Sequence, residues 1–152
     1  MARSGLKLKI AWIGRTKEPA IQSLTAEYLK RIARYSEVES LELRDEAAVL
    51  QLAAGKSHSK QGHSLVLLDP TGKQFSSEEL ADFVQDQMQR AAPVLFAIGG
   101  ADGFSAAARQ SAYARLSLGK MTLPHQLARV VLLEQLYRAF TILQGHPYHS
   151  GH

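Results

Sequence analysis

The stretch Val94 to Gly100, "VLFAIGG", decides the fold class. Its apolar residues form an unbroken run that ends in two glycines, a pattern typical of a strand that is covered on both faces. A second run of this kind, Ser64 to Asp69 ("SLVLLD"), stops at the turn-forming residues 69–72. Strands buried on both faces occur mainly in sheets that carry helices on either side. We therefore expect an α/β fold, with the strand at 64–69 central in the sheet.

The rest of the chain alternates between strand and helix patterns, which predicts a mainly parallel sheet with helices on both faces. Alternation from Leu6 to Trp12 and the segments 38–43 and 115–118 predict three further strands. Helices are expected at 18–35, 46–54, 105–112 and 124–144, and a capping box, Ser76 with Glu79, predicts another one before Pro93. With no repeat or boundary in the sequence, the 152 residues are expected to form a single domain, 1–152.

The composition excludes several classes of protein. No apolar run approaches the roughly 20 residues that a membrane span needs, and Lys7 and Lys9 interrupt the N-terminal apolar stretch, which argues against a signal peptide. The chain has no cysteine, so disulfides, thiolate zinc sites and a cysteine nucleophile are absent. We expect a cytoplasmic protein that has no membrane partner.

Positive charge is concentrated near the N-terminus. Residues 1–36 carry eight Lys and Arg against two Glu, whereas the net charge of the whole chain is only +4. A one-sided basic segment is the electrostatic signature of a polyanion partner such as RNA. A solvated helix face that keeps the protein soluble explains the pattern equally well.

The last helical segment is apolar nearly all round between Leu127 and Leu143, and its only charges are Arg129, Glu134 and Arg138. A surface helix of a small monomer buries a single stripe, so this helix predicts a homodimer that packs through it. The alternative is a central helix wrapped by its own chain. Glu134 and Arg138 have the spacing of a helical ion pair.

Two glycine-containing bends follow strands, "IGGADGF" (98–104) and "LGKMTLP" (118–124). Ligands of open α/β sheets bind at such strand ends, so the two bends could enclose one small molecule. The first bend is not a G-x-G-x-x-G motif, and its glycines could equally serve a sharp turn.

The C-terminus, "QGHPYHSGH", contains three histidines, at 146, 149 and 152, and one tyrosine. No acidic residue follows Glu134 to complete a metal site, so we expect no metal. A mobile tail is the usual behaviour of such a terminus. None of Ser105, Ser111 and Ser117 lies in the context of a catalytic triad.

With "IGGADGF", the stretch 116–140 ("LSLGKMTLPHQLARVVLLEQLYRAF") and "HPYH" (146–149), the chain closely resembles the ribosomal large subunit methyltransferase H family. These are SPOUT-superfamily enzymes that methylate a pseudouridine of 23S ribosomal RNA. The likeness runs nearly end to end, through "IGRTKEP" (13–19), "AEYLKRI" (26–32) and "VLLDPTGKQFSSEELA" (66–81). Its most specific parts are "KMTLPHQ" and "RVVLLEQLYRA".

The resemblance implies a fold that periodicity could not predict, in which a trefoil knot ties the C-terminal part of the sheet. It also implies a homodimer with its active site at the subunit interface, and S-adenosylmethionine held in the knot. The residues that the resemblance assigns to the cofactor are Leu68, Gly99, Gly100, Leu118, Gly119, Lys120, Met121, Thr122 and Leu123.

The implied reaction is direct methyl transfer to N3 of the pseudouridine on the ribosome, without a covalent enzyme intermediate. We expect Tyr148 and His149 in the tail to take part in catalysis, and His125, Arg129, Glu134 and Arg138 to shape the site and the RNA contact. Lys17, Lys30 and Arg31 are expected to bind RNA. Family members usually carry a basic residue after the Tyr-His pair, whereas this chain has Ser150, so His152 would have to replace that charge.

Two other functions were weighed. An RNA-binding module without catalysis would share the basic segment and need no cofactor. A nucleotide- or metal-dependent hydrolase would use the glycine bend or the histidines. Neither explains the specific stretch from Lys120 to Phe140.

Overall fold

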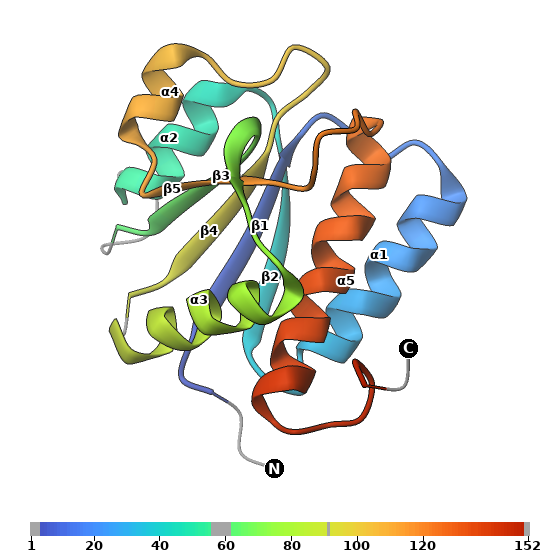
Figure 1. Ribbon diagram of the computed structural model, residues 1–152. Coiled ribbons are helices and arrows are strands. Elements are labelled where there is room, and N and C mark those ends of the chain that lie inside the picture. The colour runs from blue at the N-terminus through green and yellow to red at the C-terminus, as the bar shows by residue number, and fades with distance from the viewer. Residues whose placement is uncertain (1–3, 56–61, 91, 151–152) are drawn as a thin grey trace.

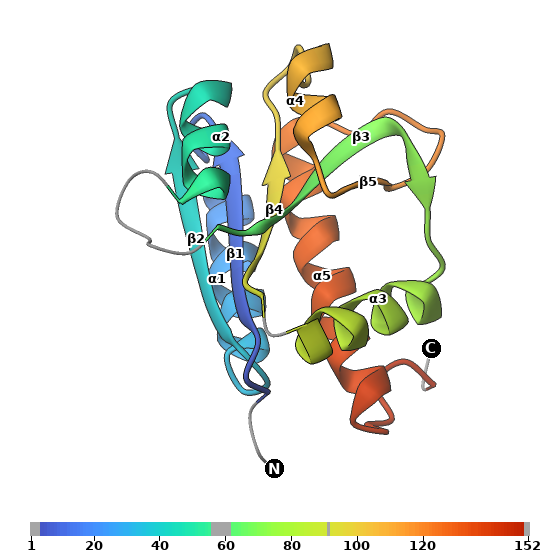
Figure 2. The same ribbon diagram turned by 90° about the vertical axis from the view of Figure 1, so that its left-hand side faces the viewer.

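The computed structural model describes residues 4–55, 62–90 and 92–150. A five-stranded sheet lies between two layers of helices (Figures 1 and 2). The strands are β1 (Lys7–Ile13), β2 (Glu37–Leu43), β3 (Ser64–Gln74), β4 (Val94–Ile98) and β5 (Ala114–Ser117). The helices are α1 (Pro19–Ile32), α2 (Glu46–Ala54), α3 (Ser77–Arg90), α4 (Ala106–Ser111) and α5 (His125–Leu143). Part of the polar loop between α2 and β3 is outside the described residues.

The sheet order is β2-β1-β4-β3-β5, and every neighbouring pair is parallel. The predicted parallel α/β fold is therefore confirmed. The strand that begins at Ser64 is internal, but the central strand is β4, all of whose residues are buried. Because all strands run the same way, their carboxyl ends meet at one edge of the sheet, where ligands of such folds bind.

Each face of the sheet has its own apolar core. On one face Leu8, Ile10 and Trp12 of β1 pack with residues of α1, α3 and α5. On the other face Ala11 of β1 packs with residues of α2 and α4. The alternation expected for the first strand is thus confirmed, and the helices cover both faces as predicted.

The strand β3 departs from the expectation. The sequence predicts that it ends at Asp69, but the strand resumes and runs to Gln74. Its pairing with β5 is interrupted, since Leu68 and Lys73 both face Leu116 of β5. Residues 69–72 therefore form a protrusion within β3 and do not end the strand. After this protrusion the strand pairs with β5 again.

The helix α5 is wrapped mainly by its own chain. Ten of its 19 residues are buried, and it packs against α1, α3 and the sheet. The apolar surface of α5 therefore does not by itself require a second chain, because the long helix is the centre of one layer. Apolar side chains still exposed nearby include Leu127 of α5 and Leu24 of α1, at 41% and 44% exposure.

Local signals in the sequence are confirmed at helix ends. In the capping box before α3, Ser76 Oγ accepts from the Glu79 amide at 3.0 Å, and Glu79 Oε1 accepts from the Ser76 amide at 2.8 Å. The short helix α4 is capped by Ser105, whose Oγ accepts from the Ala108 amide at 3.2 Å. These contacts satisfy amides that would otherwise lack a partner in the first turn.

Candidate active site

A pocket opens at the carboxyl ends of β4 and β5 and beside residues 68–70, where the pairing of β3 is interrupted. Its walls come from three segments that are far apart in sequence: residues 68–70 within β3, the glycine bend after β4 and the segment between β5 and α5. All nine residues that the resemblance assigns to the cofactor line it: Leu68, Gly99, Gly100, Leu118, Gly119, Lys120, Met121, Thr122 and Leu123. The structure thus brings the two predicted bends together around one space.

The bend after β5 is held by a single side chain. Ser117 Oγ accepts from the Gly119 amide at 3.1 Å and donates to the Gly119 carbonyl at 3.0 Å. Gly119 has φ +134°, a backbone conformation that other residues rarely adopt. This pairing fixes the direction in which the segment 120–123 crosses the carboxyl edge of the sheet (Figure 1).

Gly100 leaves open space for a ligand. A Cβ built on Gly100 would meet no atom within 4 Å, whereas one on Gly99 would lie 3.1 Å from the Gly103 backbone. Gly99 therefore packs against the backbone of Gly103 inside the bend, whereas the backbone of Gly100 is open to the pocket. Apolar side chains such as Leu68, Ile98 and Leu116 form the remaining walls.

The predicted catalytic residues of the tail meet on α5. Tyr148 Oη donates to Glu134 Oε2 at 2.8 Å, and Arg138 Nη2 donates to the same oxygen at 2.7 Å. The predicted ion pair between Glu134 and Arg138 is confirmed. The Arg138 guanidinium also lies over the Tyr148 ring, 5.0 Å from its centroid. The end of the chain is therefore docked against the last turns of α5.

His149 links this group to α3. Its Nδ1 lies 3.1 Å from Arg138 Nη1, and its Nε2 lies 2.8 Å from Glu78 Oε1. Because a guanidinium only donates hydrogen bonds, Nδ1 must accept, so the proton of a neutral imidazole sits on Nε2 and points to Glu78. Both ring nitrogens are occupied in this arrangement.

Tyr148 keeps its proton. Burial raises the pKa of its hydroxyl well above the ordinary value, and the hydrogen bond to the Glu134 carboxylate and the contact with Tyr28 raise it further. The phenol is therefore a hydrogen-bond donor throughout the neutral range and orients Glu134.

His125 and Arg129 lie elsewhere. His125, the first residue of α5, lines the pocket together with Ala128. Arg129 is fully buried and points to the loop after β1, where Nη1 donates to Thr16 Oγ1 at 2.6 Å and Nη2 to the Ile13 carbonyl at 3.2 Å. Arg129 therefore has no exposed surface with which to contact RNA in this arrangement.

The predicted RNA-binding residues do not form one compact patch. Lys17 lies in the loop before α1, and Lys30 and Arg31 lie in the last turn of that helix. Arg31 Nε donates to Glu27 Oε2 at 2.7 Å, and its guanidinium lies over the rings of Tyr28 and Tyr137. Their charges are spread along α1.

The tail group consists of Tyr148, His149, Glu134 and Arg138. Within one chain it is separate from the pocket. The pocket touches α5 at His125 and Ala128, in the first turn, whereas the tail binds Glu134 and Arg138. Arg138 lies about 20 Å further along the helix axis than His125, at about 1.5 Å per residue. Figures 1 and 2 show the tail at the foot of α5, opposite the edge with the pocket. Neither Tyr148 nor His149 lines the pocket.

A second cavity adjoins the first one. It shares the wall Leu116 to Gly119 with the pocket and extends to Ser77 of α3 and Gln135 of α5. Ser77 Oγ donates to Gln135 Oε1 at 2.7 Å, and Gln135 Nε2 donates to Glu134 Oε1 at 2.9 Å. Hydrogen bonds therefore connect the wall of this cavity to the tail group.

Sequence reasoning missed two polar residues at the pocket, Asp69 and Ser117. Asp69 lines the pocket and is 8% exposed, and Ser117 lines both cavities. The signal for Asp69 was available, because an acidic residue that directly follows a buried parallel strand lies at the ligand-binding edge. Ser117 was weighed only as a triad nucleophile, and its contact with Gly119 depends on the three-dimensional bend.

Across the described ranges, no group of three or more His, Asp or Glu is arranged to hold a metal ion, and His152 is outside those ranges. No helix in the described part of the chain is long and apolar enough to cross a membrane.

Comparisons with known proteins show the family and the fold. A family model described as "Predicted SPOUT methyltransferase" matches residues 6–149. Among solved structures, the SpoU methyltransferase AviRb of Streptomyces viridochromogenes, in complex with AdoMet, has a TM-score of 0.54 at 17% identity, covering 91% of this chain and 59% of that chain. A probable methyltransferase of Bordetella pertussis has a TM-score of 0.56 at 10% identity, covering 90% and 97%. These two likenesses show the fold alone.

Curated relatives are much closer in sequence. A protein of Koribacter versatilis named ribosomal RNA large subunit methyltransferase H is 54% identical over 97% of this chain and 100% of its own. Proteins of the same name from a Geobacter species and Gloeobacter violaceus are 42% and 43% identical, each over at least 95% of both chains. The chain therefore belongs to the SPOUT methyltransferase family, in the ribosomal RNA large subunit methyltransferase H group.

Proposed function

We propose that this chain transfers the methyl group of S-adenosylmethionine to N3 of a pseudouridine in 23S ribosomal RNA, on the assembled ribosome in the cytoplasm. One observation carries the proposal: a single pocket collects all nine residues that the family resemblance assigns to the cofactor. The names of the curated relatives support large-subunit ribosomal RNA as the substrate.

The groups that line the pocket suit the chemistry of S-adenosylmethionine. The open backbone at Gly100 and the segment 118–123 offer amide and carbonyl groups, and the leucine walls suit an adenine ring. When bound, S-adenosylmethionine supplies a methyl group on a positively charged sulfur, which is electrophilic without further activation. The protein therefore needs no nucleophile of its own, and its work is to orient the RNA base, a contribution of about 7–11 kcal/mol in favourable cases.

The tail group contains a residue that can accept the proton of N3. The His149 imidazole is the group able to accept a proton, at Nδ1, once Nδ1 is released from Arg138. Glu134 and Arg138 position the tail, and Tyr148 orients Glu134 by donating to it. The arrangement described here is then a resting state, because both nitrogens of His149 are engaged.

The separation of the pocket from the tail supports a homodimer with a shared active site. A proton acceptor must come within hydrogen-bond reach of N3, and N3 must lie about 3–3.5 Å from the methyl carbon. A second chain can bring its tail to the pocket of the first one, and the exposed Leu24 and Leu127 offer apolar surface for that contact. The trefoil knot belongs to the same proposal, supported by the path of segment 118–124 across the sheet edge (Figure 1).

The cofactor site is tested by Gly100→Trp. The indole would occupy the open space beside Gly100, so calorimetry should detect at least a tenfold loss in affinity for S-adenosylmethionine. Gly5→Trp is the matched control, since a Cβ at Gly5 also meets nothing within 4 Å but Gly5 does not line the pocket. Unchanged affinity in Gly100→Trp would remove the glycine bend from the cofactor site.

The reaction is tested on the RNA itself. Mass spectrometry of large-subunit RNA from a strain that lacks the gene should show one pseudouridine without its methyl group, and adding the gene back should restore it. Identical modification in both strains would reject the proposed reaction and favour an RNA-binding module without catalysis.

A further inference from the structure

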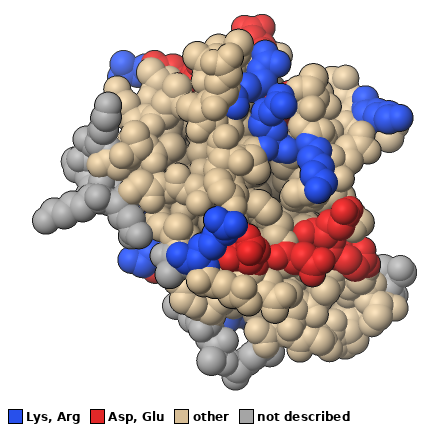
Figure 3. Space-filling model, turned by 60° about the vertical axis from the view of Figure 1, so that its left-hand side comes forward, with Lys and Arg blue, Asp and Glu red and all other residues tan. Residues whose placement is uncertain are grey.

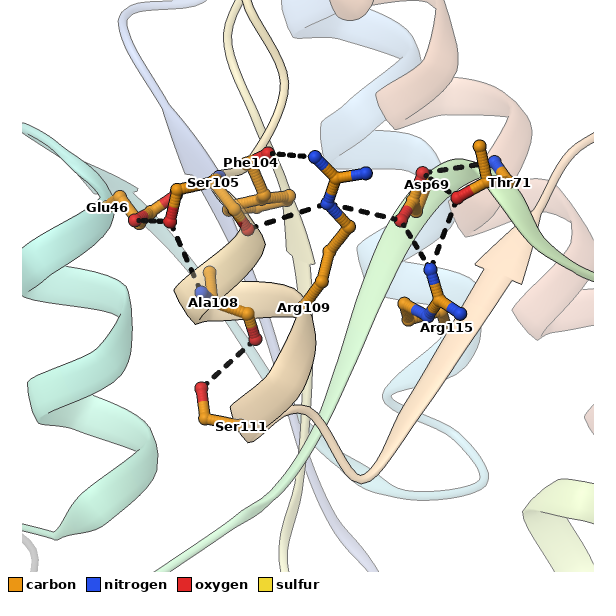
Figure 4. A network of polar contacts seen from close by, with 9 residues as sticks. All are labelled: Glu46, Asp69, Thr71, Phe104, Ser105, Ala108, Arg109, Ser111 and Arg115. Carbon is orange, nitrogen blue, oxygen red and sulfur yellow. Dashed lines mark hydrogen bonds and ion pairs between the residues drawn. The ribbon is translucent and has the colours of Figure 1, made fainter.

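The most unusual ionic group outside the tail is built around Asp69. The Asp69 side chain is 7% exposed, and Arg115 Nη1 donates to its Oδ2 at 3.3 Å. Arg109 Nε lies 3.9 Å from the same oxygen, so two guanidinium groups share one carboxylate (Figure 4). Asp69 Oδ1 accepts from the amide and the hydroxyl of Thr71, both at 3.0 Å.

This carboxylate is ionised at neutral pH. Burial alone would raise the pKa of Asp69, but the hydrogen bonds from Thr71 and the charges of Arg115 and Arg109 outweigh it and hold the pKa below its usual value. One negative charge therefore faces two positive charges, and the group carries a net charge of about +1.

Both arginines are held in place but remain open to solvent. Arg109 Nη2 donates to the Phe104 carbonyl at 3.3 Å, and Arg115 Nη1 also donates to Thr71 Oγ1 at 3.2 Å. Their side chains are 39% and 41% exposed. A guanidinium has five N–H donors, so each arginine retains donors for a further acceptor. Planar forks of this kind suit the oxygens of a phosphate.

The helix that carries Arg109 is itself fixed. A six-residue helix such as α4 is too short to be stable alone. Glu46 of α2 accepts from the Ser105 amide at 2.7 Å and from the Ser105 hydroxyl at 2.6 Å (Figure 4). Arg109 is therefore presented by an element that is anchored from a neighbouring helix.

The position of the group relates it to the proposed reaction. Asp69 lines the pocket at the carboxyl edge of the sheet, and the two arginines that contact Asp69 lie next to this wall, outside the residues that line the pocket. Figure 3 shows a band of Asp and Glu across the lower part of this face, with Lys or Arg at its left end, and most of the other Lys and Arg side chains above it, below a few acidic side chains at the top edge. The helix α3 carries four exposed carboxylates, Glu78, Glu79, Asp82 and Asp86. A polyanion that approaches this face is attracted to the upper part and repelled from α3.

We propose that Arg109 and Arg115, aligned by Asp69, bind a backbone phosphate of the substrate RNA beside the pocket. The inference rests on the proposed function, because it takes RNA as the ligand. It places an RNA contact on the α4 and β5 side of the pocket, apart from the basic residues of α1. A phosphate held there would fix the strand next to the nucleotide that is methylated.

The test uses the full-length protein and large ribosomal subunits from a strain that lacks the gene. Arg109→Gln leaves Asp69 paired with Arg115 and Thr71, so the fold should be retained, and circular dichroism checks this. Methyl transfer at varied subunit concentration should show KM raised about tenfold, with kcat within about twofold of wild type. The dependence of log affinity on log salt should become shallower by roughly 0.7–0.9.

Two comparisons make the test specific. Arg90→Gln removes the same charge from α3, where Asp86 pairs with Arg90 at 3.0 Å, and should leave KM unchanged. Arg115→Lys keeps the charge but loses the planar fork, so KM should rise while the salt dependence stays close to wild type. A KM that is unchanged in both Arg109→Gln and Arg115→Lys, together with an unchanged salt dependence in Arg109→Gln, would overturn the inference.

The proposed function and this inference fail in different ways. If wild-type protein transfers no methyl group and binds no cofactor by calorimetry, the proposed function is rejected. Direct binding of fluorescent large-subunit RNA still tests the phosphate site in that case. Weaker RNA binding of Arg109→Gln than of Arg90→Gln supports the site, and equal binding rejects it.

Discussion

At the scale of single residues, Arg129 is a charged side chain that stabilises the fold through buried hydrogen bonds. It is 0% exposed, and it donates to Thr16 and to the carbonyls of Ile13 and Gly14. Its guanidinium also lies 5.1 Å from the Trp12 ring centroid. A buried charge is costly unless it is hydrogen-bonded. These contacts hold the loop between β1 and α1 against the first turns of α5.

Arg129→Met should therefore lower the free energy of unfolding by about 2–5 kcal/mol, because the Thr16 hydroxyl and two carbonyls lose their donor. Chemical denaturation measures this effect. Arg90→Met, at an exposed i,i+4 pair, is the control and should change stability by less than about 1 kcal/mol. A stability of Arg129→Met equal to that of the control would show that the buried contacts contribute nothing.

At the scale of elements, the interrupted pairing of β3 with β5 shapes the pocket. Gly72 lies where the protrusion of β3 returns to β5, and a Cβ there would be 2.7 Å from the Arg115 carbonyl carbon and 2.9 Å from the Leu116 amide nitrogen. Both neighbours are backbone atoms that cannot rotate away. A glycine is required at this point because the backbones of β3 and β5 touch.

Gly72→Ala should push β5 away and disturb the wall from Leu116 to Gly119 that both cavities share. We expect a loss of about 1–3 kcal/mol in unfolding free energy and weaker cofactor binding by calorimetry. Gly5→Ala is the matched control, since its Cβ meets nothing within 4 Å. If Gly72→Ala keeps its cofactor affinity and its stability, β5 can shift to make room for the methyl group without a loss of free energy of unfolding.

At the scale of the whole molecule, the two halves of the proposed active site lie at opposite ends of α5. The cofactor pocket is at the carboxyl edge of the sheet, and the tail binds Glu134, Arg138 and Glu78. A homodimer that brings the tail of one chain to the pocket of the other one unites them. This is a stronger reason for a dimer than the apolar content of α5, most of which its own chain covers.

Mixed dimers test this arrangement. Tyr148→Phe with His149→Ala should keep cofactor affinity and lose most turnover, and Gly100→Trp should lose cofactor binding. If the site is shared, mixing these two inactive variants should restore up to about a quarter of wild-type activity per dimer, since one intact site forms in half of the dimers. Sedimentation should give a dimer for each variant. Inactive mixtures of verified dimers would place each site within one chain.

Much of the architecture follows from local patterns. The unbroken runs at 64–68 and 94–98, the capping box at Ser76 and the spacing of Glu134 and Arg138 depend on residues a few positions apart, and all appear in the structure. The bends at 98–104 and 118–124 could be placed at a ligand site because parallel strands end at one edge. The family followed from motifs that span nearly the whole chain.

What the sequence by itself determined is therefore the alternation of strands and helices, the edge that carries the pocket and the family. Only the tertiary structure decided that α5 is wrapped by its own chain, that Arg129 holds Thr16, and that Asp69 joins Arg109 to Arg115. The physical reason is distance along the chain. A periodic pattern reports how neighbours share a face, whereas contacts between residues tens of positions apart depend on the path of the backbone, which no local pattern encodes.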